Sequence, residues 1–221
     1  MAADLQPLAI DVVSDVVCPW CYLGGRRLAL ALERAGGAFD VRWRPFQLDP
    51  NIPAGGLERR AYLKAKFRDD ARLQQIHDQL TALGAEVGVA YAFDKIERAP
   101  NTLDAHRLIR WAAEANVQDK AVDRLFRLYF EEGGDVGDRA MLAEVAQACG
   151  LDGAQIERRL AGDDDVEAVR EDIEEAHRLG VTGVPFFILG ARFAVAGAQS
   201  VDVLVAAIER TRAALAGVEI A

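Results

Sequence analysis

A Cys-Pro-Trp-Cys motif occupies residues 18–21 of the chain. The apolar, β-branched run 8–13 before it predicts a strand, and leucines and alanines recur at helical spacing over 22–35. We therefore expect Cys18 where the strand ends and the helix begins. Unpaired backbone N–H groups and the positive end of the helix dipole favour a thiolate there, and the thiolate is the nucleophilic form of cysteine. Cys21 follows on the same helical face and could attack a mixed disulfide formed at Cys18.

Three interpretations of the two cysteines compete. Zinc would need two further ligands, but the remaining candidates, Cys149, His77, His106 and His177, are scattered without paired spacing. A static disulfide is disfavoured because it would close a loop of only four residues. A redox-active dithiol is the interpretation we favour, since a C-x-x-C next to a β-α pattern is typical of one. Pro19 suits this placement because the first helical turn does not need its N–H.

The composition limits the class of protein. The chain has 221 residues and a net charge of −9, with acidic and basic residues interspersed, which argues against nucleic acid or anionic membrane as a partner. The segment 1–7 shows no basic region followed by an apolar stretch, and no apolar run approaches membrane-spanning length. Three cysteines, an odd number, suit a reducing compartment. We therefore expect a soluble, cytoplasmic protein that requires neither a metal nor an organic cofactor.

The elements around the motif predict an α/β protein. Residues 39–44 alternate apolar and polar side chains, which predicts a second strand and makes the first fifty residues a β-α-β unit. The motif then lies at the carboxyl end of the first strand, where α/β sheets bind their ligands. The span 57–179 has mainly helical patterns and is too long for a simple connection. Sheet patterns return over 180–196 as a hairpin, followed by a last helix over 201–215.

This order predicts two domains. Residues 1–56 and 180–221 would form one discontinuous α/β domain, and 57–179 would form an inserted α-helical subdomain. Pro185 lacks a backbone donor, so we expect it at the first position of its strand.

Several segments carry a resemblance to a known family. They are Asp-Val-Val-Cys-Pro-Trp-Cys-Tyr-Leu-Gly at 15–24, Asn-Thr-Leu-Asp-Ala-His-Arg at 101–107, Gly-Val-Pro-Phe-Phe at 183–187 and Gly-Ala-Gln at 197–199. In this order, around a long helical segment, they resemble the DsbA-like branch of the thioredoxin superfamily, and more narrowly the FrnE-like thiol–disulfide oxidoreductases. The resemblance implies a thioredoxin-like fold with a large helical insertion.

The resemblance also implies roles for the motif and for the segment that faces it. Cys18 corresponds to an exposed nucleophilic cysteine and Cys21 to a buried resolving one, with Pro19 and Trp20 beside the substrate. Pro185 corresponds to a cis-proline facing the dithiol, and the backbone of Val184 would pair with an extended substrate segment.

The segment 101–107 would begin a helix of the insertion that overhangs the dithiol. The resemblance therefore makes Asn101 and His106 candidates for substrate contact. A helix-capping role for Asn101 and a helix-surface role for His106 are the alternatives. For Cys149 we favour a small buried residue over a regulatory thiol.

The relatives of this family supply the main alternative function. The 2-hydroxychromene-2-carboxylate isomerases and kappa-class glutathione transferases resemble the FrnE-like proteins, and use glutathione with a serine at the position of Cys18. Retention of both cysteines favours disulfide exchange, with glutathione as one candidate redox partner. The segment 197–199 could bind its carboxylate at a helix N-terminus.

We accordingly predict a thiol–disulfide oxidoreductase acting on protein or small-molecule thiols and disulfides, as a monomer or homodimer. A glutathione-dependent isomerase or transferase is the first alternative. A non-catalytic binding module or chaperone is the second alternative, and its function would survive the loss of both thiols. The redox direction depends on the dithiol's potential against its compartment, which the residues between the cysteines do not fix.

Overall fold

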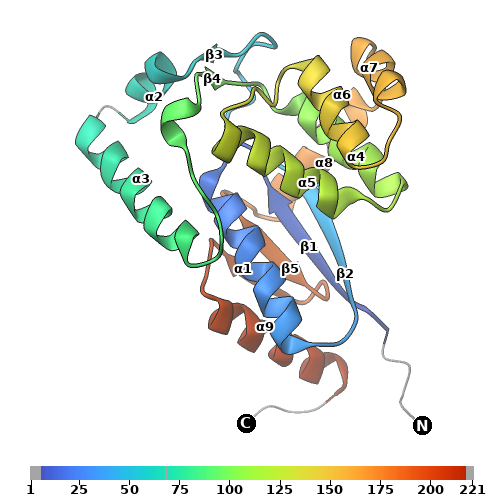
Figure 1. Cartoon of the computed structure of the whole chain (residues 1–221). Coiled ribbons are helices and arrows are strands. Elements are labelled where there is room, and N and C mark those ends of the chain that lie inside the picture. Colours follow the sequence, from blue (N-terminus) through green and yellow to red (C-terminus); the bar gives the residue numbers. More distant parts are fainter. Residues whose placement is uncertain (1–5, 68, 218–221) are drawn as a thin grey trace.

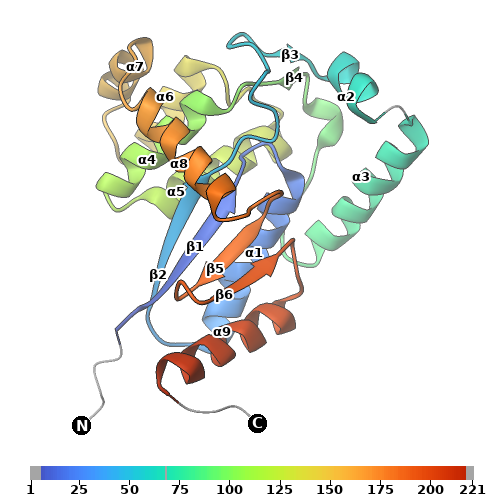
Figure 2. The ribbon, with the colours of Figure 1, turned by 180° about the vertical axis from the view of Figure 1, so that it is seen from behind.

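A four-stranded mixed sheet forms the centre of the computed structural model, which describes residues 6–67 and 69–217. The strand order is β2-β1-β5-β6 (Figures 1 and 2). Strand β1 (Leu8–Ser14) runs parallel to β2 (Phe39–Pro45) and antiparallel to β5 (Phe186–Leu189), which pairs with β6 (Phe193–Ala196). Because β1 lies between β2 and β5, the chain segment that follows it leaves from the middle of the sheet.

Two helices cover one face of this sheet. Helix α1 (Pro19–Ala35) connects β1 to β2, and helix α9 (Val201–Leu215) follows the β5–β6 hairpin and packs beside α1 (Figure 1). The period of two along β1 turns every second side chain toward these helices. The core on this face comprises Leu8, Ile10, Val12, Leu28, Ala31, Phe187, Leu189, Leu204 and Ile208.

The opposite face has a smaller cover. Val13 of β1 packs there with Phe46, Ala176 and Val181. Ala176 belongs to helix α8 (Val166–Arg178), which lies against the upper part of this face in Figure 2. One face of the sheet therefore packs against α1 and α9, and the other is closed mainly near the end where β1 leads into α1.

The span between β2 and α8 is mainly helical, as predicted. Its helices are α2 (Arg59–Phe67), α3 (Asp70–Ala85), α4 (Leu103–Glu114), α5 (Gln118–Arg127), α6 (Arg139–Ala148) and α7 (Gly153–Ala161), with shorter turns η1 (Phe93–Lys95) and η2 (Leu128–Glu132). The antiparallel pair β3 (Leu57–Glu58) and β4 (Arg98–Ala99) was not predicted, because two residues are too few to show a strand period.

The helical span forms two groups of helices (Figure 1). Helices α2 and α3 lie on one side, with α3 alongside α1, and α4 to α7 lie on the other. The boundaries predicted for an inserted subdomain, 57–179, stay a prediction. The outer ends of the predicted α/β domain, 1–5 and 218–221, lie outside the described residues. Within the described residues, no helix is both long and apolar enough to cross a membrane.

The first turn of α1 belongs to a second, larger core. Cys18, Cys21 and Tyr22 pack there with buried residues of α4, α5 and η2, among them Leu108 and Phe130. The motif therefore lies where the end of the sheet meets the helical span.

Candidate active site

Cys18 occupies the N-cap position of α1, where the sequence predicts it. Its backbone is extended (φ −89°, ψ 111°), and its carbonyl accepts hydrogen bonds from the N–H groups of Cys21 (3.0 Å) and Tyr22 (3.3 Å). Pro19 begins the helix, where its missing N–H leaves no gap in the hydrogen bonding. The two cysteines come within 3.3 Å of each other. A thiolate at Cys18 would thus lie against the N-terminus of a 17-residue helix with Cys21 within attacking reach.

The Cys18 thiol faces the segment before β5. Its Sγ donates to the carbonyl of Val184 at 3.6 Å, and the Val184–Pro185 peptide bond is cis. Pro185 is buried and directly precedes β5 instead of occupying its first position, since β5 begins at Phe186. The structure therefore brings Cys18, Val184 and Pro185 together although 166 residues separate the first two.

Gly24 explains how α1 approaches this segment so closely. A Cβ at position 24 would lie 2.9 Å from Cγ of Pro185 and 3.2 Å from the ring of Phe187. Contacts that short force a neighbour to shift, so only glycine lets the helix and the proline pack at this distance. The glycine that follows the motif thus has a packing role at the site.

The expectation of an exposed nucleophile was wrong. Cys18 is 3% exposed and Cys21 is fully buried. The wall formed by Trp20, Val184 and the helices of the insertion covers the sulfur of Cys18, and periodicity in the sequence does not report such long-range cover. The thiol lies in the wall of a cavity that is partly open to solvent, since Leu48 and Phe67 of that wall are exposed.

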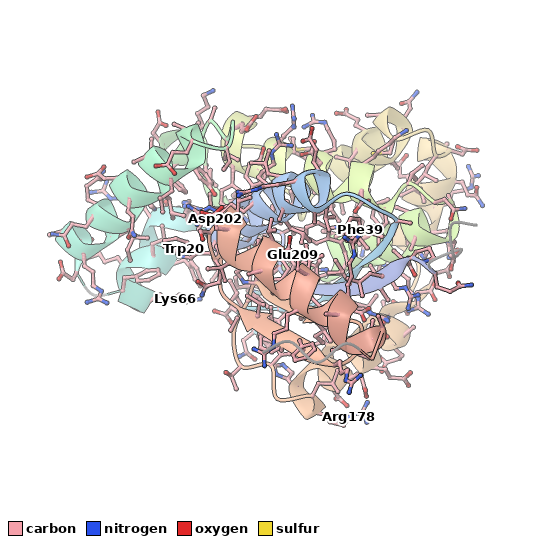
Figure 3. All side chains as sticks on the ribbon, turned by 90° about the horizontal axis from the view of Figure 1, so that it is seen from below. Trp20, Phe39, Lys66, Arg178, Asp202 and Glu209 are labelled. Carbon is pink, nitrogen blue, oxygen red and sulfur yellow. The ribbon has the colours of Figure 1, made fainter. Side chains whose placement is uncertain are left out.

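That cavity has a volume of about 350 Å³. The motif contributes Cys18, Pro19 and Trp20 to its wall, Val184 contributes beside Cys18, and α2 and α3 supply further side chains. Its apolar wall includes Val17, Leu48, Ile52, Tyr62, Leu63, Phe67, Leu73, Ile76, Ala99, Pro100 and Phe130, and its charged or titratable groups are Asp15, Asp49, Arg59, Lys66 and His77. Figure 3 shows Trp20 of α1 and Lys66 of α2 on the same side of the molecule.

Burial governs the protonation of Cys21. It raises the pKa of the Cys21 thiol well above its usual value, and the neighbouring Cys18 thiol raises it further. The backbone of Asp15 and the hydroxyl of Ser14 act in the opposite direction, with smaller effects. Cys21 is therefore a protonated thiol at neutral pH.

The raised pKa of Cys21 predicts the pH dependence of resolution. Only the Cys21 thiolate can attack a mixed disulfide at Cys18, so the rate of this step should rise about tenfold per pH unit while the pH stays below that pKa. We expect no plateau between about pH 6 and about pH 9. The measurement is stopped-flow release of a chromophoric thiol from a preformed Cys18 mixed disulfide. A plateau that begins below about pH 8 would contradict the prediction.

Asn101 and His106 do not form part of the cavity wall. The Asn101 side chain donates to the carbonyl of Ile52 (2.6 Å) and accepts from the N–H of Leu103 (3.0 Å), which makes it a tie between a loop and the start of α4. The buried His106 ring bonds to the carbonyl of Phe46 (2.9 Å). Their substrate contact stays a prediction, whereas their neighbours Pro100 and Thr102 do line the cavity.

Asp15 is a site residue that the sequence reasoning missed. It is 1% exposed, its backbone carbonyl accepts from the N–H of Cys18 (3.0 Å), and its Oδ2 accepts from the N–H of Leu48 (2.8 Å). Its Oδ1 lies 3.4 Å from Nε2 of His106. Asp15 thus links the turn before Cys18 to the loop after β2, next to His106.

The contribution of α2 and α3 to the cavity was also missed. The available signal was compositional: Arg59–Phe67 carries four basic residues and no acidic one in a chain with net charge −9. His77 was another residue without an assigned role, and it stacks on Phe93 with 4.1 Å between ring centroids.

The remaining predicted groups lie away from the cavity. Ala198 accepts from the Arg27 guanidinium (2.8 Å), and carboxylate binding by 197–199 stays a prediction. Cys149 follows α6 with 8% exposure, and burial raises its pKa. Among residues 6–67 and 69–217, no cluster of three or more His, Cys, Asp or Glu side chains could hold a metal ion.

Comparison with known proteins identifies similar chains. Residues 9–209 match the model of a family described as DSBA-like thioredoxin domain. The uncharacterized protein YwbO of Bacillus subtilis is 30% identical over 203 residues, which are 90% of this chain and 94% of that protein.

Solved structures show the same likeness. A probable DsbA oxidoreductase of Streptomyces coelicolor is 32% identical, with a TM-score of 0.85 over 93% of this chain and 90% of that one. A 2-hydroxychromene-2-carboxylate isomerase, 18% identical, has a TM-score of 0.73 over 96% of this chain and 100% of that one, which shows a shared fold alone.

Proposed function

The chain belongs to the family of DSBA-like thioredoxin domains, and from this premise we propose that it is a thiol–disulfide oxidoreductase that works through Cys18 and Cys21. The thioredoxin-like fold with a helical insertion, expected from the sequence, is confirmed. The observation that carries the proposal is Cys18 at the N-cap of α1, with Cys21 within 3.3 Å and a cavity in front of the sulfur.

The proposed reaction has two exchange steps. The Cys18 thiolate attacks one sulfur of a substrate disulfide, forms a mixed disulfide and releases the other sulfur as a thiolate. Cys21 then loses its proton and attacks the sulfur of Cys18, which forms the Cys18–Cys21 disulfide and releases the second substrate thiol. Two electrons pass from the dithiol to the substrate, and the reverse sequence oxidises a substrate dithiol.

Each residue proposed for the site has a role in these two exchange steps. The helix N-terminus stabilises the Cys18 thiolate both at the start and as a leaving group. Trp20 and Pro19 form the wall next to the sulfur, and the Pro19 carbonyl is held by the hydroxyl of Tyr91 at 2.6 Å. The Val184 carbonyl, which accepts from the thiol here, is available to a bound substrate once the thiol has reacted. Pro185, packed on Gly24, fixes the position of Val184.

The setting of this reaction is part of the proposal. We place the protein in a reducing, cytoplasmic compartment, as a monomer or homodimer, with protein or small-molecule thiols and disulfides as partners. The narrower FrnE-like assignment rests on the motifs at 15–24, 101–107 and 183–187. Glutathione is proposed as a redox partner and not as a resident cofactor.

Equilibration of the Cys18–Cys21 pair against a series of glutathione buffers tests the proposal, together with a disulfide-reductase assay on the same sample. We expect a reversible two-electron transition that disappears in Cys18→Ser, and its midpoint will give the redox direction. Cysteines that stay reduced and inert across the series would overturn the proposal. Turnover of a glutathione conjugate without dithiol oxidation would then support the isomerase or transferase alternative. Binding or chaperone activity that survives the loss of both thiols would support the alternative of a non-catalytic binding module or chaperone.

A further inference from the structure

The surroundings of the Cys18 sulfur restrict which disulfides can reach it. Cys18 is 3% exposed and opens onto a cavity of about 350 Å³. Pockets of this size hold small organic molecules. A small organic disulfide fits a space of this volume as it stands.

Helix α2 supplies a wall of distinct chemistry. Its side chains Tyr62, Leu63 and Phe67 present apolar surface to the cavity, and no residue of the helix is buried. With Leu73 and Ile76 of α3 they face the motif across the space. Apolar side chains left half-buried around a cavity gain stability when an apolar ligand covers them.

The wall carries two cations and two carboxylates, and both cations, Arg59 and Lys66, belong to α2. The Arg59 guanidinium donates to the hydroxyl of Tyr129 (3.0 Å), and the Lys66 ammonium donates to the hydroxyl of Tyr62 (2.7 Å). Neither cation forms a salt bridge with any residue in the described part of the chain. Burial and the charge of Arg59 lower the pKa of the third basic group, His77, so it adds no charge at neutral pH.

Each carboxylate of the wall accepts a backbone hydrogen bond through one oxygen, and the buried Oδ1 of Asp15 has no hydrogen-bond partner among the described residues. Asp15 accepts from the N–H of Leu48 (2.8 Å), and Asp49 accepts from the N–H of Asn51 (3.2 Å). The cavity therefore offers an incoming ligand apolar surface and two cations that lack an anionic partner among residues 6–67 and 69–217.

Building on the proposed function, we propose that the cavity selects small organic disulfides, and the thiols derived from them, that carry an anionic group on an apolar body. The apolar body lies against Trp20, Leu63 and Ile76, and the carboxylate or similar anion pairs with Lys66 and Arg59. The exchange balances without a further reactant in a single turnover. The reduced dithiol gives two electrons to the bound disulfide, the Cys18–Cys21 disulfide forms, and two molecules of the substrate thiol leave.

A charge reversal on α2 with a matched control tests this inference. Lys66→Glu changes a cation of the cavity wall, and Lys64→Glu makes the same change at a residue of α2 that does not line the cavity. The pre-reduced full-length protein reacts in single turnover with 5,5′-dithiobis(2-nitrobenzoate), an anionic aromatic disulfide, and with 4,4′-dithiodipyridine, a neutral one. Both released thiols absorb light, so stopped-flow absorbance gives each second-order rate constant.

We expect Lys66→Glu to lower the ratio of the anionic to the neutral rate constant about five- to tenfold, and Lys64→Glu to leave it within about twofold. Equal ratios in the two variants would overturn the inference while leaving the oxidoreductase intact. A wild-type protein whose Cys18 reacts with neither probe would instead contradict the proposed function.

A binding experiment without redox chemistry distinguishes a failure of this inference from a failure of the proposed function. Titration calorimetry with 2-naphthoate and with neutral 2-naphthalenemethanol measures cavity binding without disulfide chemistry. We expect 2-naphthoate to bind more tightly than the alcohol, and Lys66→Glu to remove that preference. Equal affinity for both compounds in the wild-type protein would also overturn the inference.

Discussion

Replacing Cys18 with serine should abolish disulfide exchange. A serine hydroxyl is not ionised at neutral pH and cannot form the mixed disulfide, so the helix N-terminus has no thiolate to stabilise. We expect residual reductase activity below about 1% of the wild-type rate, measured with a small disulfide under steady reduction. The fold should be retained, because serine fits where the small Cys18 side chain packs.

Cys21→Ser separates the two roles within the motif. This variant keeps the Cys18 sulfur but lacks the resolving thiol, so the mixed disulfide should accumulate and appear by intact-protein mass spectrometry. Cys149→Ser is the matched control, since it removes a buried thiol that lies outside the cavity wall. Wild-type turnover in Cys18→Ser, or a mixed disulfide located at Cys149, would refute the assigned roles.

Replacing Arg107 with methionine should cause the largest loss of stability. The Arg107 side chain is 1% exposed, and its guanidinium donates to four backbone carbonyls, those of Arg159, Leu160, Gly162 and Asp164. It also pairs with Asp104 at 2.7 Å. Methionine removes the buried side-chain donor from these carbonyls at the end of α7, of which, among the described residues, only that of Arg159 keeps a backbone donor, the N–H of Gly162 (3.3 Å). We expect the free energy of unfolding to fall by about 3 kcal/mol or more, measured by urea denaturation.

Arg170→Met is the matched control for this substitution. Arg170 makes a salt bridge with Glu167, but its side chain is 55% exposed, so its loss should cost less than about 1 kcal/mol. In Arg107→Met, Asp104 keeps its second partner, Arg139, at 2.8 Å, and the cost therefore falls on the carbonyls. A loss no greater than that of Arg170→Met would show that water replaces the guanidinium.

Arg107 changes the interpretation of the segment 101–107. The resemblance suggested that this segment contacts substrate through Asn101 and His106, yet both side chains bond to backbone carbonyls of the loop that follows β2. Arg107 bonds to the far end of the insertion. In the structure the segment lies at the start of α4, and its side chains form hydrogen bonds with the loop after β2 and with the end of α7.

Local spacing was enough to determine much of this protein. The strand–motif–helix order around Cys18 and Cys21, the helical span and the final hairpin and helix all follow from side-chain periodicity and turn residues, which depend on neighbours within a few positions. These features fixed the fold class and the dithiol at a helix N-terminus, and the structure and the family match confirm the fold.

Tertiary structure alone decided what surrounds the dithiol. The burial of Cys18, the bond from its thiol to Val184 and the cavity wall supplied by Arg59 and Lys66 join segments that are 41 to 166 residues apart. Periodicity tells which face of a helix is apolar, but it does not tell which other element that face meets. For that reason the sequence identified the two thiols that we propose to react, and only the packing of α2 and α3 determined the cavity beside Cys18.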